Sequence, residues 1–232
     1  MQILVHTNFH RAVDRAKEIL HEKVDKKTVL FLSGDVASKS LYASLAKEKV
    51  IHPASVGMID ERYGKKFHTK SNELMIRESG LLDYFDEEHI PFRPILQKGK
   101  SREETAKLYD KTTRDLFFHY RKSVAIMGIG TDGHTSSIIP NRENFTDPMF
   151  AEGKRDLFVG EFNDIKSEYK ERIGMTFAGL ALIDYFIVLA FGKEKKKALQ
   201  QMFVPGSMEE VPARFFVQSA FKNTVILTDQ QM

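Results

Sequence analysis

The 232-residue chain contains no cysteine. This absence excludes disulfides, zinc–thiolate sites and a cysteine nucleophile, and it suits a reducing compartment. Any catalysis must therefore use other side chains. The eight histidines show no metal-ligand spacing, so the sequence predicts neither a metal site nor a bound cofactor.

The chain also lacks a long apolar run. Its N-terminal segment turns polar before any apolar stretch reaches secretory length, and the most apolar later run, residues 180–191, is interrupted by Asp184. We therefore expect no membrane partner and a cytoplasmic location.

A basic tract is missing as well. The formal net charge is +3, and the lysines and arginines are scattered among 32 acidic residues. Such scattering gives little support for nucleic acid binding, whereas a few cations gathered in one cleft would serve a small anionic substrate. We predict a small-molecule partner and no nucleic acid partner.

The composition is that of an ordinary globular protein, with 42% hydrophobic and 29% charged residues. No internal repeat, low-complexity tract or linker divides the chain. Because domains usually contain roughly 100–200 residues, a chain of 232 residues could form one large domain or two small ones, and we predict one domain over residues 1–232.

Short apolar runs alternate with segments of helical period along the chain. Strands are expected at residues 28–34, 55–59, 123–130, 157–159, 185–191 and 224–227. Helices are expected at residues 8–20, 38–49, 72–79, 102–120, 178–184 and 193–203. Residues 172–178 fit either a strand or the entry of a helix, and a loop should carry Pro91 and Pro94. The alternation predicts an α/β domain with a mostly parallel, doubly wound sheet.

The strongest predicted strand, residues 123–130, runs directly into the segment GIGTDGHTSS, residues 128–137. Ligands of such sheets bind beyond the carboxyl ends of the strands, and glycines there let the backbone approach a ligand closely. Histidine is the side chain that titrates near neutral pH, so His134 is a candidate general base for water. Asp132 would orient the imidazole or a substrate hydroxyl. The alternative is a glycine-rich turn with an incidental histidine.

Two further strand ends carry clustered charge. The segment DERY, residues 60–63, is by itself typical of a solvated loop, but Arg62 would also suit a bidentate contact to phosphate or carboxylate. The segment GKEKKKAL, residues 192–199, opens a predicted helix, where its first lysines would meet an anion. A basic helical face is the common alternative there.

Taken together, these segments resemble the 6-phosphogluconolactonase family, which shares its sheet with glucosamine-6-phosphate deaminases and ribose-5-phosphate isomerases. SGDVASKSLY (33–42) is similar to the family's SGGSTPKALY, and DERY followed by Ser71-Asn72 is similar to DERxVP…SN. GIGTDGHTSSIIP (128–140) resembles GMGxDGHTASLFP, and GKEKKKAL resembles GxxKAEAL. The resemblance covers about residues 29–199, and the third match is the specific one.

The residues that follow the DGH motif favour the lactonase branch of the family. Deaminases carry DGHIAFNEP, in which a glutamate seven residues after the aspartate assists ring opening, and that position is Ile139 here. Thr135 after the histidine, and DER in place of the deaminase's DEY, also resemble the lactonases. A deaminase or isomerase would need another acid.

The resemblance implies hydrolysis of a sugar-phosphate lactone, 6-phosphoglucono-1,5-lactone, in the pentose phosphate pathway by a monomer or homodimer. His134 would activate water and then protonate the departing ring oxygen, with Asp132 in support. Backbone amides of the glycine-rich turn are candidates for stabilising the tetrahedral intermediate. The expected substrate- and phosphate-binding residues are Ser33, Gly34, Arg62, Gly130, Thr135, Arg172 and Lys195.

The first loop departs from the family pattern. The family's GGST supplies small residues and hydroxyls around the phosphate, whereas this chain has Gly34, Asp35, Val36 and Ala37. An aspartate near phosphate weakens binding unless it points away or meets a cation such as Lys39. The change bears on the phosphate group more than on hydrolysis, and it also fits a non-catalytic sugar-phosphate binder.

Overall fold

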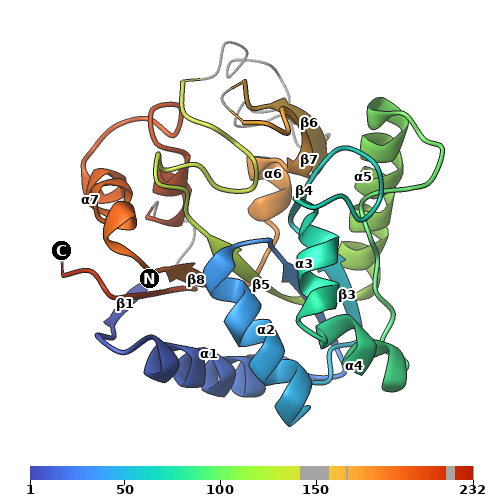
Figure 1. Ribbon diagram of the computed structural model, residues 1–232, viewed down its shortest axis with the longest axis horizontal. Coiled ribbons are helices and arrows are strands. Elements are labelled where there is room, and N and C mark those ends of the chain that lie inside the picture. Colours follow the sequence, from blue (N-terminus) through green and yellow to red (C-terminus); the bar gives the residue numbers. More distant parts are fainter. Residues whose placement is uncertain (142–156, 166, 218–222, 232) are drawn as a thin grey trace.

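The computed structural model describes residues 1–141, 157–165, 167–217 and 223–231. A parallel sheet at its centre contains β1 (Gln2–Val5), β2 (Thr28–Leu32), β3 (Ser55–Met58), β5 (Lys122–Gly128), β8 (Tyr185–Ala190) and β9 (Thr224–Thr228). The strand order is β1-β9-β8-β5-β2-β3 (Figure 1). Every residue of β2 and β9 is buried, which explains why these strands are continuous apolar or β-branched runs. The predicted α/β class is confirmed.

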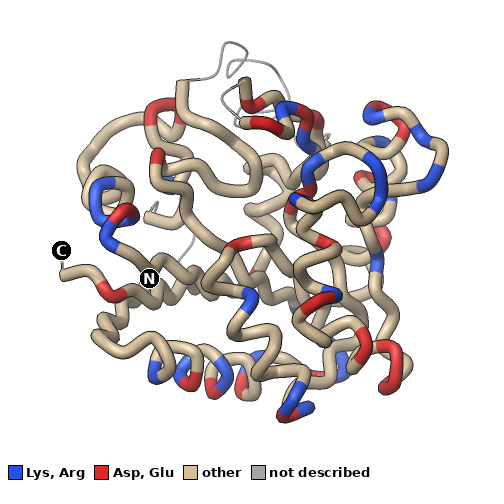
Figure 2. The backbone as a smooth tube through the Cα atoms, viewed as in Figure 1, with Lys and Arg blue, Asp and Glu red and all other residues tan. Residues whose placement is uncertain are grey.

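Helices flank this sheet. They are α1 (Phe9–Lys23), α2 (Val36–Glu48), α3 (Asn72–Glu78), α4 (Leu81–Glu87), α5 (Arg102–His119), α6 (Phe177–Leu180) and α7 (Lys196–Phe203), with short 3-10 helices at Lys193–Lys195 and Pro212–Phe216. Acidic and basic residues are interspersed along α1 (Figure 2). Ser101 and Glu104 form the capping box that begins α5, as the sequence predicts. Within the described residues, no helix is long and apolar enough to cross a membrane.

A second, antiparallel sheet was not predicted. It contains β4 (Asp60–Arg62), β6 (Val159–Asn163) and β7 (Glu171–Met175) in the order β4-β7-β6, and it packs against α5 (Figure 1). The interpretation of DERY as a solvated loop is therefore wrong, because these residues form a strand and Glu61 is fully buried. Three charged residues give no apolar alternation from which a strand could be recognised.

Several element boundaries also differ from the sequence predictions. β1 is a short, half-exposed edge strand, and α4 occupies part of the expected loop before Pro91. The ambiguous region 172–178 divides at Thr176, which ends β7 and caps α6. The helix expected at 178–184 is shorter, and the one expected at 193–203 begins as a 3-10 helix.

The topology places a crevice between β2 and β5. From β2 the chain adds β3 on one side, then returns to add β5, β8 and β9 on the other. Ligands of open α/β sheets bind beyond the carboxyl ends of strands at such a reversal. The segments that follow β2 and β5 begin at Ser33 and Ile129, within two of the sequence motifs.

Candidate active site

A cavity of about 270 Å³ opens at these strand ends. Its lining includes most of the residues selected from the sequence: Ser33, Gly34, Arg62, Gly130, His134, Thr135, Arg172 and Lys195. Asp132, the remaining selected residue, contacts His134 from outside the lining. The structure thus brings together segments that follow β2, β3, β5 and β8.

His134 and Asp132 form a hydrogen-bonded pair. The imidazole Nδ1 lies 2.7 Å from Asp132 Oδ1, and the His134 amide donates to the same oxygen at 3.1 Å. Partial burial opposes ionisation of Asp132, but the hydrogen bonds and charge of His134 outweigh it and lower the pKa of Asp132 to about 2. An ionised Asp132 accepts a hydrogen bond from Nδ1–H, so a neutral imidazole keeps Nε2 as its acceptor nitrogen. Nε2 is thus the atom that can take a proton from water.

Gly130 allows this pair to form. A Cβ atom at position 130 would overlap the His134 ring. The turn closes through hydrogen bonds from Gly130 N to His134 O at 2.8 Å and from Gly133 N to Gly130 O at 3.0 Å. Gly133 adopts a φ of 86°, a left-handed conformation that suits glycine.

The same turn uses most of its own amides. The amides of Gly130 and Gly133 donate within the turn, that of His134 donates to Asp132, and that of Thr135 donates to Ile138 O at 3.3 Å. These four groups are not free to stabilise an oxyanion. The expectation that the turn supplies oxyanion donors therefore does not hold for them.

Two arginines from the second sheet face the cavity. Arg62 of β4 lies directly opposite Arg172 of β7 in the antiparallel ladder. Like charges in such positions repel one another unless anions compensate them. Arg172 Nη2 contacts Asp164 Oδ2 at 2.9 Å, whereas Arg62 Nη1 donates to the neutral Asn72 Oδ1. Among the described residues, no carboxylate pairs with Arg62, so its charge is available to an anionic ligand.

Lys195 supplies a third cation. Its Nζ donates to Ile129 O at 2.6 Å and lies 3.7 Å from Asp35 Oδ2. The neighbouring Lys193, Lys196 and Lys197 are exposed, so Lys195 alone of this run lines the cavity. The suggested partnership of Asp35 with Lys39 is wrong, because Lys39 instead pairs with Glu78 at 3.0 Å.

Glu61 is a residue that sequence reasoning missed. Its buried carboxylate accepts hydrogen bonds from the amides of Arg62, Asn72 and Glu73 and from the Ser71 hydroxyl, all at 2.7–2.9 Å. Burial raises the pKa of Glu61 to about 7, against these four bonds, which favour the ionised form. Glu61 thereby fastens the start of α3 to β4 and fixes the backbone of Arg62. These hydrogen bonds explain why DERY and Ser71-Asn72 occur together as one sequence motif.

Glu61→Gln should destabilise the fold. The amide nitrogen of glutamine would face two of the four donors, and unsatisfied buried groups of this kind cost about 2–3 kcal/mol. Urea unfolding should show a lower midpoint at unchanged slope. Glu18→Gln, an exposed change on α1, is the control. A loss no larger than that of the control would contradict this assignment.

Further lining residues escaped the sequence analysis. Ser137 Oγ donates to Asp60 Oδ2 at 2.6 Å, and Asn72 Nδ2 donates to the Asp60 carbonyl at 2.8 Å. All three line the cavity. Their signal was present, since Asp60 and Asn72 belong to the DER…SN block and Ser137 to the histidine motif, but nothing in the sequence assigned them contacts.

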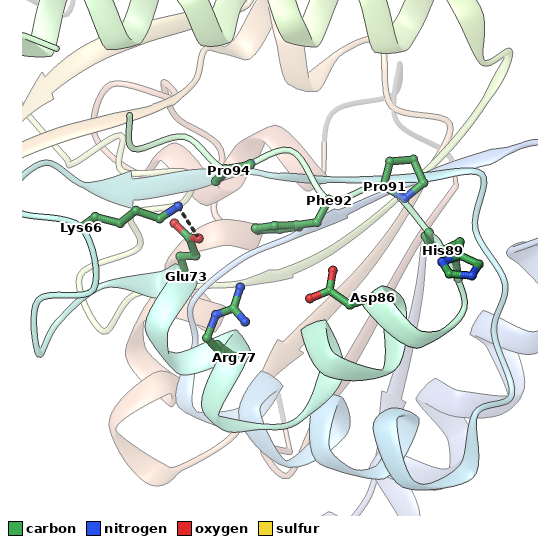
Figure 3. Close-up of a pocket in the computed structure, with 9 residues that line it drawn as sticks. Lys66, Glu73, Arg77, Asp86, His89, Pro91, Phe92 and Pro94 are labelled. Atoms are coloured by element: carbon green, nitrogen blue, oxygen red, sulfur yellow. Dashed lines mark ion pairs between the residues drawn. The ribbon is translucent and has the colours of Figure 1, made fainter. Parts of the chain in front are cut away.

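A larger hollow of about 540 Å³ is lined by residues of α3, of α4 and of the segment 89–94 (Figure 3). Its lining includes Lys66, Glu73, Arg77, Asp86 and Phe92, and Lys66 Nζ lies 3.3 Å from Glu73 Oε1. None of the residues selected from the sequence lines it. This hollow has the larger volume. The smaller cavity is nevertheless the candidate active site, because it contains His134 of the histidine–aspartate pair and the three cationic side chains.

Comparison with known proteins identifies the family of the chain. Residues 2–226 match the family model described as glucosamine-6-phosphate isomerases/6-phosphogluconolactonase. The chain belongs to this family. Among curated relatives, a 6-phosphogluconolactonase of Rhizobium meliloti is 26% identical over 82% of this chain and 80% of its own length. One of Nostoc is 29% identical over 79% of this chain and 75% of its own.

Solved structures of the family share the fold. A 6-phosphogluconolactonase from Shewanella baltica superposes with a TM-score of 0.78 at 19% identity, covering 98% of this chain and 95% of that one. The enzyme from Trypanosoma brucei gives a TM-score of 0.75 at 21% identity, with the same coverage.

Proposed function

We propose that the protein is a cytoplasmic enzyme that hydrolyses 6-phosphoglucono-1,5-lactone to 6-phosphogluconate in the pentose phosphate pathway. The observation that carries this proposal is the His134–Asp132 pair, whose acceptor nitrogen is Nε2, in a cavity that Arg62, Arg172 and Lys195 also line. A general base beside several cations suits a substrate that combines a hydrolysable carbonyl with a phosphate. The names of the curated relatives support the same reaction.

His134 performs both proton transfers. Its Nε2 takes a proton from water while the water oxygen attacks the lactone carbonyl and forms a tetrahedral intermediate. The bond between that carbon and the ring oxygen then breaks, and the imidazolium gives its proton to the departing oxygen. Asp132 stays ionised throughout and stabilises the transient imidazolium through the 2.7 Å contact at Nδ1.

The phosphate binds at the other part of the cavity, among Arg62, Lys195 and the turn after β2. The Gly34 backbone packs against Asn72, whose side-chain oxygen accepts from Arg62, so this turn and Arg62 are neighbours. The Ser33 hydroxyl is buried and has no partner among the described residues, which leaves it available to a phosphate oxygen. Arg172 adds positive charge beside Arg62.

The deaminase or isomerase alternative lacks its acid. Ile139 is not part of the cavity lining, and the carboxylates that do line it within the described residues are Asp35 and Asp60. Asp35 accepts from the Ala37 amide, and Asp60 accepts from Ser137. Each of these carboxylates already has a hydrogen-bond partner within the protein, and neither occupies the sequence position of the missing glutamate.

Two substrates offered in parallel test the reaction type. Purified protein should open 6-phosphogluconolactone faster than the spontaneous rate and should release no ammonia from glucosamine 6-phosphate. Ammonia release would show that the family's other chemistry operates here. Tight binding of a sugar phosphate without turnover of either compound would instead identify a non-catalytic binder.

A further inference from the structure

Asp35 brings an internal negative charge into the candidate active site. As the N-cap of α2, it accepts from the Ala37 amide through Oδ1 at 2.9 Å, and its Oδ2 lies 3.7 Å from Lys195 Nζ. Its carboxyl group packs closely on Gly128, where a Cβ atom would come within 2.9 Å of it. The two charged side chains are only 21% and 15% exposed. The carboxylate is therefore held in place by a cap, a cation and close packing.

The turn that carries Asp35 lies between two of the cavity cations. On one side Gly34 packs against Asn72, to which Arg62 donates, and on the other side Asp35 reaches Lys195. An anion at the beginning of α2 would be attracted by both cations and by the first amides of the helix. Asp35 already supplies negative charge to that place.

The pairing of Asp35 with Lys195 makes the effect of Asp35 specific to anionic ligands. Arg172 is compensated by Asp164 outside the lining, whereas Lys195 is compensated by Asp35, which lines the cavity itself. A phosphate that approaches Lys195 therefore meets a carboxylate and is repelled by it. A neutral ligand meets no such repulsion, and it leaves Lys195 paired.

We propose that Asp35 is a specificity-determining residue that weakens binding of the substrate's phosphate group. Through it, the preference for phosphorylated over unphosphorylated aldonolactones is reduced. This inference rests on the proposed function for its substrate class, but the competition between Asp35 and phosphate is a property of the binding site alone.

Asp35→Asn tests the proposal with little change of structure. Asparagine is as good an N-cap as aspartate, so the variant removes the charge and keeps the cap of α2. Glu78→Gln is the matched control, because it also removes one negative charge beside α2. Glu78 pairs with Lys39, and neither residue lines the cavity. Asp35→Ser, a second capping residue, replaces the asparagine variant if that protein does not fold.

Two measurements are made on each protein. The first is the ratio of kcat/KM for 6-phosphogluconolactone to kcat/KM for glucono-1,5-lactone, and the second is the affinity for inorganic phosphate by calorimetric titration. Removing a like charge near the phosphate should raise both the ratio and the phosphate affinity by about tenfold in Asp35→Asn. Glu78→Gln should change each by less than about twofold, since exposed charges at a distance are screened.

A ratio and a phosphate affinity that change no more than in the control would overturn the proposal. A fall in phosphate affinity would also overturn it, because Asp35 would then serve to orient Lys195 toward phosphate. If no protein turns over either lactone, the proposed function fails, yet the phosphate titration still decides the role of Asp35.

Discussion

Replacement of His134 by alanine should lower kcat for lactone hydrolysis by about 10³-fold while KM changes little. The imidazole is the group in the cavity whose Nε2 can accept a proton, because Nδ1 is bound to the ionised Asp132. Alanine removes both proton transfers but leaves the three cavity cations in place. The loss should therefore fall on the chemical step and spare binding.

Asp132, which holds the imidazole of His134, should give a smaller loss of kcat when it is replaced. Asp132→Asn should lower kcat by about 10–100-fold, because an amide holds the ring less well and does not stabilise the imidazolium. His10→Ala, on the exposed side of α1, is the control for loss of a histidine. If His134→Ala retains more than a tenth of the wild-type kcat, another group must activate the water.

Replacement of Arg62 by alanine should lower kcat/KM for the phosphorylated lactone by about 100-fold, mainly through KM. Arg62 is the cavity cation that pairs with no carboxylate among the described residues, so its full charge is available to the phosphate. The unphosphorylated lactone should lose less than about threefold, since it makes no charge-assisted bond to this side chain.

The two substrates distinguish binding from damage to the site. Arg11→Ala, on the exposed face of α1, provides the control, and phosphate titration gives a measure that does not depend on turnover. An equal loss on both lactones would mean that Arg62 supports the shape of the second sheet and not the phosphate. Arg62→Lys should recover part of the affinity, because lysine keeps the charge but not the planar pair of donors.

The sequence predicted the strand ends that build the site, because buried parallel strands leave unmistakable apolar runs. The ends of β2, β5 and β8 follow such runs, and the residues selected after them lie together in one cavity. The motifs selected the residues, but they could not give the contacts. That Lys195 and not Lys39 meets Asp35 depends on how β8 and α2 pack.

The second sheet shows why part of the site escaped prediction. β4 is three charged residues long, so neither periodicity nor composition marks it as a strand. Its position depends on Glu61, whose partners include the backbone amides of Asn72 and Glu73 in α3, eleven and twelve residues further along. Because every residue except proline has a backbone amide, such contacts require no particular residue type, and the sequence therefore does not reveal them. The pairing of Arg62 opposite Arg172 follows from this sheet and was invisible for the same reason.

Acid release from freshly prepared 6-phosphogluconolactone in a pH-stat tests the central claim most directly. The initial rate, corrected for spontaneous opening, should rise in proportion to the concentration of wild-type protein. The corrected rate should fall by about 10³-fold when the same amount of the His134→Ala protein is used. A wild-type rate that does not exceed spontaneous opening at any protein concentration would contradict the account.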